Sequence, residues 1–316
     1  MKTRFLLIIS ILVITCSCKK VITHSPVVNP PVGQEDTSQL KNFHKNITVV
    51  NWNIEWFGSS DMFEGNLDVQ ETNAAKILKY LNADLYGICE VVDTARFGRM
   101  IRTGMGDEFR YKISFYPTAG GAQKLAFVYN RHIFRNVSVR PFLGLSANAY
   151  NYFAQRFPFL LKADVVINEK RNVLHFFLLH AKANADNDSY IRRLNGSVEM
   201  KDSLDRYYGN QYVMIIGDFN DHLNGSIVAG KPSPYQNFVN DAGYNPITLP
   251  LNTTGYQSTI FYPNSVIDQQ MISSNMNKWY IASSAMIRTD VSQPVPDFNT
   301  ANTSDHYPVS SMYNIR

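Results

Sequence analysis

Short apolar stretches rich in β-branched and aromatic residues alternate along the chain with amphipathic stretches. The strand-like stretches include residues 47–58, 124–143, 171–183 and 211–221. Two others, 68–82 and 189–208, repeat apolar positions at helical spacing. A turn near Asn130 and Arg131 predicts a pair of neighbouring strands within 124–143. Because no internal linker interrupts this alternation, we predict one mixed α/β or α+β domain over 47–316.

Polar side chains recur where these apolar stretches end. They are Asn51 and Asn53, Glu90, His180, Asp218 and Asn220, Asp268, and Asp305 with His306. Burying a carboxylate beside an apolar strand costs several kcal/mol per ion, roughly, unless a cation or hydrogen bonds compensate. Strand ends that converge would therefore form a pocket of oxygen and imidazole groups. Such a pocket suits a hard divalent cation and a phosphate.

The first residues differ in composition from the rest. Lys2 and Arg4 precede an apolar run over 5–14, which is typical of a secretory signal and too short to span a membrane comfortably. Two cysteines follow, and a cysteine after small residues resembles a bacterial lipoprotein signal. We therefore expect residues 1–18 to be a lipoprotein signal peptide, with Cys18 lipidated and Cys16 as the alternative. A plain cleaved signal or a short anchor remains open.

Residues 19–46 are rich in proline and polar residues and predict a flexible tether. The chain would then sit in the envelope of a bacterium, at the outer membrane or cell surface, attached to the membrane by its lipid anchor alone. The net charge of +4 includes Lys2 and Arg4; without them 28 basic residues face 26 acidic ones. That balance is too mild to indicate nucleic acid by itself. Only Cys89 would remain, so no internal disulfide is possible.

Six segments carry the polar strand ends in order: NWNIEWFG, ICEVVD, LLHAKA, IIGDFND, SVIDQQMIS and TSDHYPV. Together they resemble the endonuclease/exonuclease/phosphatase superfamily, which includes deoxyribonuclease I, apurinic endonucleases, neutral sphingomyelinases and inositol polyphosphate 5-phosphatases. The resemblance covers 47–316. It implies an α+β fold like that of deoxyribonuclease I, a four-layer α/β/β/α sandwich of two mixed β-sheets flanked by helices. It also implies phosphate-ester hydrolysis with Mg²⁺, or with Mn²⁺ or Ca²⁺ in its place.

The resemblance assigns the metal site to three of these positions. Glu90 matches the metal-binding glutamate of the superfamily, although Cys89 stands where a glutamine usually precedes it. Asn53 matches an asparagine that contacts metal or phosphate, and Asp305 would supply a further metal contact. Whether one or two ions bind is left open.

The remaining motif residues match catalytic roles. His306 and Asp268 match a hydrogen-bonded pair that, with Asp218, would activate water. Asn220 and His180 match residues that contact the phosphate or the leaving group. Because Asp218 and Asn220 are two positions apart, we expect their side chains to point the same way.

Residues outside the motifs give weaker indications. Lys124 is expected to bind substrate, and three arginines are either further contacts or solvated charges: Arg156, Arg192 and Arg193. Four other residues are expected in structural or surface positions: Glu55, Trp56, His175 and Asp221.

The predicted function is that of a cell-surface phosphodiesterase of nuclease type, acting on nucleic acid. One alternative is an enzyme that acts on inositol phosphates or phospholipid headgroups, and another is an inactive surface binding module. We expect a monomer, and no protein partner is indicated.

Overall fold

The computed structural model describes residues 46–316 except residue 254. The predicted signal peptide (1–18), with Cys16 and Cys18, and all but the last residue of the predicted tether (19–46) lie outside the described residues. No helix in the described part is both long and apolar enough to cross a bilayer.

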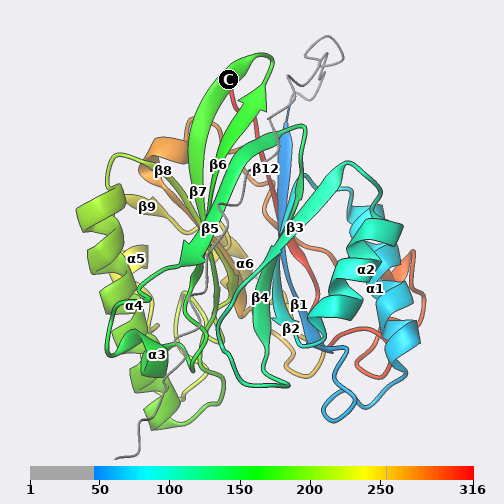
Figure 1. The fold of residues 1–316 in the computed structure, drawn as a ribbon. Coiled ribbons are helices and arrows are strands. Elements are labelled where there is room, and N and C mark those ends of the chain that lie inside the picture. Colours follow the sequence, from blue (N-terminus) through cyan, green and yellow to red (C-terminus); the bar gives the residue numbers. More distant parts are fainter. Residues whose placement is uncertain (1–45, 254) are drawn as a thin grey trace, which may run out of the picture. The chain divides into compact units, whose positions relative to one another are not determined.

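Two six-stranded sheets form the centre of the fold (Figure 1). In spatial order, the first sheet contains β11 (Met286–Ile287), β12 (Val309–Tyr313), β1 (Ile47–Phe57), β2 (Leu85–Val91), β4 (Lys124–Asn130) and β3 (Phe109–Ile113). The second contains β5 (Phe134–Pro141), β6 (Phe159–Ile167), β7 (Lys170–His180), β8 (Tyr212–Asp218), β10 (Asp268–Ser273) and β9 (Tyr244–Asn245). Each sheet is mixed, because β1 and β2 run parallel, as do β7 and β8, whereas the other pairs are antiparallel.

Helices cover the outer face of each sheet. The first sheet packs against α1 (Leu67–Leu81) and α2 (Thr94–Gly104), and the second against α3 (Ala149–Tyr152), α4 (Asn187–Tyr208), α5 (Gln236–Val239) and α6 (Leu249–Asn252). Two short 3₁₀ turns are η2 (Ser274–Met276) and η3 (Thr289–Ser292). Side-chain caps start the longer helices: Asn66 accepts from the backbone of α1, and Asp186 from that of α4. The predicted four-layer α+β sandwich is confirmed.

An apolar core and a polar tie hold the two sheets face to face. Val49, Phe127 and Ile216 belong to the buried cluster between the sheets. Within this core, buried Asn51 donates from Nδ2 to the carbonyl oxygen of Gly217 over 3.2 Å and accepts from Nε2 of Gln270 over 2.8 Å. Both partners lie in or beside strands of the opposite sheet. Buried amides need such partners, so this contact favours one alignment of the sheets.

The prediction of paired strands within 124–143 is wrong. β4 pairs with β2 and β3 in the first sheet, whereas β5 pairs with β6 in the second. The chain crosses between sheets at residues 131–133. Ile133 and Phe134 are buried in the core between the sheets, and their burial favours a crossing over a hairpin.

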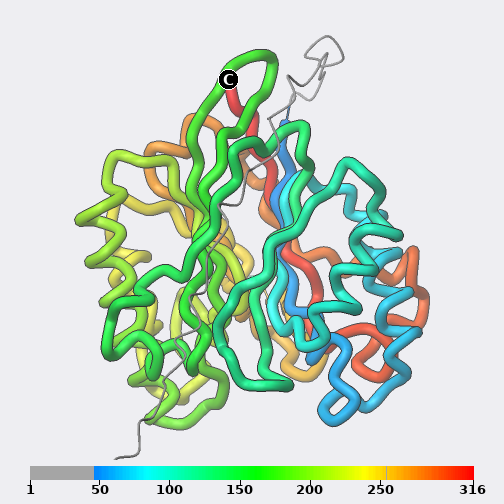
Figure 2. The backbone as a smooth tube through the Cα atoms, viewed as in Figure 1, coloured from blue at the N-terminus to red at the C-terminus, as the bar shows by residue number. Residues whose placement is uncertain are grey.

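One edge of the two sheets collects the polar strand ends. Parallel strands β1 and β2, and likewise β7 and β8, bring their carboxyl ends to this edge. β10 and β12 start there, because β10 is antiparallel to β8 and β12 is antiparallel to β1. Figure 2 shows the last strand (red) beside the first (blue), although they are far apart in sequence.

Candidate active site

Two carboxylates from different sheets meet at this edge through one amide. Asn53, on β1, donates from Nδ2 to Oε1 of Glu90 over 2.9 Å and to Oδ2 of Asp218 over 3.0 Å. Its Oδ1 accepts from the backbone N–H of Glu55 over 3.0 Å, which fixes the orientation of the amide. In this arrangement Asn53 positions the two carboxylates. Its predicted contact with metal or phosphate remains a prediction.

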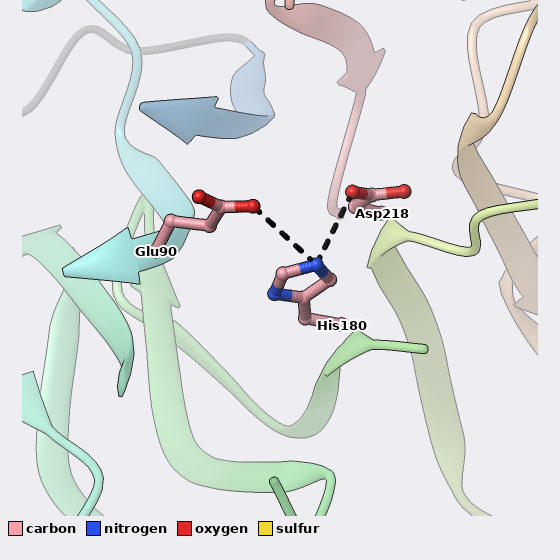
Figure 3. A group of neighbouring side chains, drawn as sticks. All are labelled: Glu90, His180 and Asp218. Carbon is pink, nitrogen blue, oxygen red and sulfur yellow. Dashed lines mark ion pairs between the residues drawn. The ribbon is translucent and has the colours of Figure 1, made fainter. Parts of the chain in front are cut away.

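An imidazole completes this cluster. Nε2 of His180, at the end of β7, lies 3.6 Å from Oε1 of Glu90 and 3.5 Å from Oδ2 of Asp218 (Figure 3). These separations exceed normal hydrogen-bond lengths. The side chain of His180 is buried, and its Nδ1 has no hydrogen-bond partner among the described residues. One ligand atom from each of the three side chains lies within 4.8 Å of the others, so they are close enough to share one ion.

A second group adjoins the first through Asp218. Nδ1 of His306 lies 2.7 Å from Oδ2 of Asp268, which also accepts from Oγ of Ser258 over 2.8 Å. The backbone of His306 is fixed as well, because its carbonyl oxygen accepts from the Trp52 indole over 2.8 Å. Ligand atoms of Asp218, Asp268 and His306 again lie within 4.8 Å of one another. The predicted pair of His306 and Asp268 is therefore brought together beside Asp218.

Burial sets the protonation of the first cluster. It raises the pKa of Glu90, and it raises the pKa of Asp218 to about 7, with the negative charge of Asp268 as the next cause. Burial also lowers the pKa of His180 far below its usual value, and the positive charge of Arg156 adds to this effect. At neutral pH His180 is thus a neutral imidazole, the form that binds metal ions.

His306 has the opposite protonation. Burial alone would lower its pKa, but the charges of Asp268 and Asp305 outweigh burial and raise that pKa well above the usual value. Asp305 lies next to the ring, with Oδ1 3.8 Å from Nε2 of His306. His306 is therefore favoured as an imidazolium, with Asp268 hydrogen-bonded at Nδ1 and Asp305 near Nε2.

These side chains fit a divalent cation. Glu90 and Asp218 are buried carboxyl groups whose pKa values burial raises, so a nearby positive charge would stabilise their ionised forms. His180 turns Nε2 of a neutral imidazole toward Glu90 and Asp218. Oxygen ligands predominate, as Mg²⁺ and Mn²⁺ prefer.

Glu55 and Trp56 also belong to the site, although the sequence predicted only structural roles for them. Burial and the charge of Asp305 raise the pKa of Glu55 to about 7, and its Oε1 accepts from Thr300 over 2.7 Å. The backbone N–H of Trp56 donates to Oε2 of Glu90 over 2.9 Å. A sequence signal for Glu55 existed, because strand alternation places it on the same face as Asn53.

Left-handed backbone conformations cluster at these strand ends. Glu55, Trp56, Glu90 and Asn220 have φ values of 44°, 45°, 67° and 50°. Non-glycine residues in such conformations cost about 1–3 kcal/mol each in strained cases and often occur at functional sites. The amide of Asn220 donates to the carbonyl oxygen of Ala181 over 3.2 Å, and its backbone N–H donates to Asp218 over 2.9 Å. Its phosphate contact remains a prediction.

Two basic residues expected as substrate contacts or solvated charges are engaged inside the protein. Arg193 is buried and donates from Nε to Oδ2 of Asp221 over 2.8 Å, with both side chains fully buried. The expectations of a substrate-facing or solvated Arg193 and of a surface Asp221 are therefore wrong. Arg156 donates to the carbonyl oxygens of His180 and Ala181 over 3.3 and 3.1 Å and so braces the end of β7.

The remaining basic candidates, Lys124 and Arg192, donate to backbone carbonyl oxygens. Lys124 donates from Nζ to the carbonyl oxygens of Phe115 and Pro117, so its ammonium group holds a loop in this structure. Its predicted contact with substrate remains a prediction. Arg192 donates to the carbonyl oxygen of Asn151.

Solved structures share this fold. The endonuclease/exonuclease/phosphatase from Bacteroides vulgatus is 14% identical, with 86% of this chain and 99% of that chain covered at a TM-score of 0.61. The human Nocturnin catalytic domain, solved with bound sulfate, is 12% identical, with 85% and 94% covered at a TM-score of 0.58. D. rerio TDP2 complexed with single-strand DNA product is 12% identical, with 85% and 99% covered at a TM-score of 0.55.

No family model and no curated protein matches the chain. At identities of 12% to 14% the structural likeness shows the fold alone. This is the fold that the six motifs imply.

Proposed function

We propose that this chain is a divalent-metal-dependent phosphodiesterase of nuclease type. One observation carries the proposal: Asp218 belongs both to the cluster with Glu90 and His180 and to the group with Asp268 and His306. A candidate cation site and a candidate proton-transfer pair therefore share one carboxylate at the sheet edge. Hydrolysis of a phosphate ester requires both parts, with charge neutralised on the phosphate and a proton moved from the attacking water.

Glu90, Asp218 and His180 would hold the metal ion, with Asp305 and Glu55 close enough to add negative charge. When bound, such an ion would neutralise charge on the phosphate and help to activate water. Asn53 keeps Glu90 and Asp218 in place through its two N–H groups.

The proton transfers follow from the two pKa shifts. Burial raises the pKa of Asp218 to about 7 in the metal-free protein, and a bound cation would favour its ionised form, which can accept a proton from water at neutral pH. His306, held as an imidazolium by Asp268, can donate from Nε2 to a phosphate oxygen or to the leaving group. The sequence-based interpretation had His306 and Asp268 activate the water. The raised pKa of His306 favours donation instead.

Nucleic acid is the substrate class we propose. Support comes from the fold shared with D. rerio TDP2, which was solved with a single-strand DNA product. The sulfate bound to the Nocturnin catalytic domain supports an anion site in this fold.

A substrate panel tests the proposal. It comprises single-stranded and duplex DNA, RNA, an inositol polyphosphate, sphingomyelin and bis-p-nitrophenyl phosphate, each with Mg²⁺, Mn²⁺ or EDTA. We expect DNA and the small diester to be hydrolysed with metal and not with EDTA. Turnover of only the lipid or inositol substrate would replace the nuclease assignment.

Paired variants separate catalysis from binding. Glu90→Gln and His306→Gln should each lower kcat by about 10²- to 10⁴-fold, the range for loss of a catalytic acid, base or charge. His132→Gln is the matched control, because this partly exposed imidazole lies on a turn outside the candidate site, where its backbone N–H donates to Asn130. Unchanged turnover in both site variants would leave only a binding module.

We also propose that the enzyme is anchored in the bacterial envelope through a lipid on Cys18. The support is the basic start, the apolar run and the cysteine in residues 1–18. Labelled palmitate should be incorporated by the wild type and by Cys16→Ser, and not by Cys18→Ser. Labelling that is lost only in Cys16→Ser would identify Cys16 as the lipidated residue.

A further inference from the structure

A large groove lies away from the candidate active site. Its volume is about 1010 Å³. It is lined by residues of β5, of the turn at 142–146 that follows β5, of β6 and β7, and of α4. On β7, His175 and Phe177 point to this outer side, whereas Phe176 and Leu178 face the other sheet. His180 belongs to the inner side, so the groove and the candidate active site open on different faces of β7.

Strand register builds the floor of the groove. Ser138 on β5 is opposite Lys162 on β6, and Lys162 is opposite His175 on β7. Residues directly opposite one another share a face of the sheet, so these three form one row across it. Arg140 is two positions after Ser138 and therefore lies on the same face. Two cations thus stand side by side on the floor.

Neither of these two cations forms a direct ion pair with an acid among the described residues. In the part of the chain that the structure describes, neither Arg140 nor Lys162 has a carboxylate oxygen within 4.0 Å, and Arg140 instead donates to Oη of Tyr208 over 2.7 Å. Asp164, the next acidic residue along β6, is already paired with Arg171 over 2.8 Å. Glu199 is the one carboxylate that lines the groove, on the wall formed by α4.

The positive charges of Lys162 and Arg140 affect the pKa of the buried His175 imidazole. Burial, followed by the positive charges of Lys162 and Arg140, lowers the pKa of His175 to about 4. No carboxylate is among the causes that shift the pKa of His175. An anion placed between Lys162 and Arg140 would therefore raise the pKa of His175, which makes this imidazole a reporter of binding.

Apolar surface surrounds the cations. Phe142 and Tyr208 stack edge to face, with ring centroids 6.0 Å apart, and Leu160 lines the floor beside them. Two large side chains form exposed lips: Leu145 on the turn is fully exposed, and Tyr207 on α4 is 66% exposed. Exposed apolar side chains around a concave site often mark a binding surface.

We infer that this groove binds a small amphiphilic anion. Its carboxylate, sulfonate or phosphate group would lie between Arg140 and Lys162, and its apolar body would lie along Leu160, Tyr208 and Leu145. The volume suits an organic molecule and greatly exceeds that of a lone inorganic anion. The inference does not depend on the proposed hydrolysis, because the groove shares no residue with the site at the sheet edge.

Anilinonaphthalene sulfonate, an aromatic anion, is the probe for this site. The full chain should bind it saturably at one site, with increased fluorescence, and decanoate should displace it. Lys162→Gln should weaken binding by about fivefold or more, since it removes one charge-assisted contact. N-phenyl-1-naphthylamine, which lacks the sulfonate, should bind the wild type and Lys162→Gln equally. Binding should also move the His175 imidazole resonances.

Lys170→Gln is the matched control. Lys170 is an exposed lysine on the same β6–β7 hairpin and does not line the groove, so its replacement should change probe affinity less than twofold. Equal affinity in Lys162→Gln and the wild type would overturn the inference, and so would equal weakening in both variants. Displacement of the probe by phosphatidylglycerol vesicles but not by decanoate would also overturn it, because the groove would then recognise a membrane surface. The side chain of Lys162 is exposed and forms no hydrogen bond or ion pair with the described residues, so the unfolding temperature of Lys162→Gln should match the wild type.

Discussion

Replacing Asp268 by asparagine tests how the candidate active site handles protons. The substitution preserves side-chain shape but removes the negative charge that lies 2.7 Å from Nδ1 of His306. The asparagine oxygen can still accept one hydrogen bond, and Ser258 can still reach this position. The change therefore removes charge with little change in packing.

The structure sets the size of the expected effect. A hydrogen bond to a charged group contributes about 1.5–3 kcal/mol. At 1.4 kcal/mol per factor of ten, its loss lowers activity by about ten- to a hundredfold. Misorientation of the imidazole would increase the loss, as in triads whose carboxylate is replaced by an amide. We expect Asp268→Asn to reduce kcat/KM about a hundredfold.

The pH dependence should change in a defined direction. Asp268 is a major cause of the raised pKa of His306 and the second cause of the raised pKa of Asp218. Without its charge both pKa values fall. Activity rises with pH as Asp218 ionises and falls as His306 loses its proton, so both limbs of the pH profile should move to lower pH.

The assay is kcat/KM for bis-p-nitrophenyl phosphate from about pH 5 to about pH 9, where such a bell-shaped profile would be resolved. Asp205→Asn is the control, since Asp205 pairs with Lys201 on α4, away from the sheet edge. Activity of Asp268→Asn within twofold of wild type at every pH, or limbs that do not move, would refute the proton-transfer scheme.

Three further outcomes are expected. Burial raises the pKa values of Glu55 and Asp218 to about 7, so the folded state binds more protons than the unfolded chain from about pH 4 to 7. The free energy of unfolding of the metal-free protein should therefore fall as pH rises through this window. Mg²⁺ at about 100 times its Kd should restore about 2.7 kcal/mol, measured by urea unfolding. Stability that rises over this window would contradict the assignment. Asp221→Asn leaves Arg193 buried without its carboxylate and should lower the free energy of unfolding by about 3–5 kcal/mol, whereas a loss below about 1 kcal/mol would argue against a buried pair. Gly217 has a φ of 135°, and a Cβ there would lie 2.0 Å from a carbonyl oxygen of β7. Gly217→Ala should therefore cost about 1–3 kcal/mol and lower the unfolding temperature. An unchanged unfolding temperature would rule out the close approach.

Much of the site could be predicted from the sequence because its signals are local. A run such as Val213–Ile216 that ends in Asp218 shows, without any structure, a carboxylate at the end of a buried strand. Six such ends in order carried the resemblance that implied the four-layer fold. The same resemblance, and not a local signal, paired His306 with Asp268 across 38 positions.

The tertiary structure decided what depends on distant packing. The sequence of 124–143 is compatible with a hairpin or with a crossing between sheets, and burial of Ile133 in the core selects the crossing. Arg193 and Asp221 each read as surface charges, and only the approach of α4 to the end of β8 buries them as a pair.

The protonation states belong to the same category. Asp218 and His306 are ordinary titratable residues in the sequence, and their opposite charge states follow from burial and from neighbours on other strands. The chain by itself determined which residues end at the sheet edge, because alternation and hydrophobicity are properties of short segments. Only the folded arrangement determined their charges, because desolvation and Coulomb interactions depend on distances between segments.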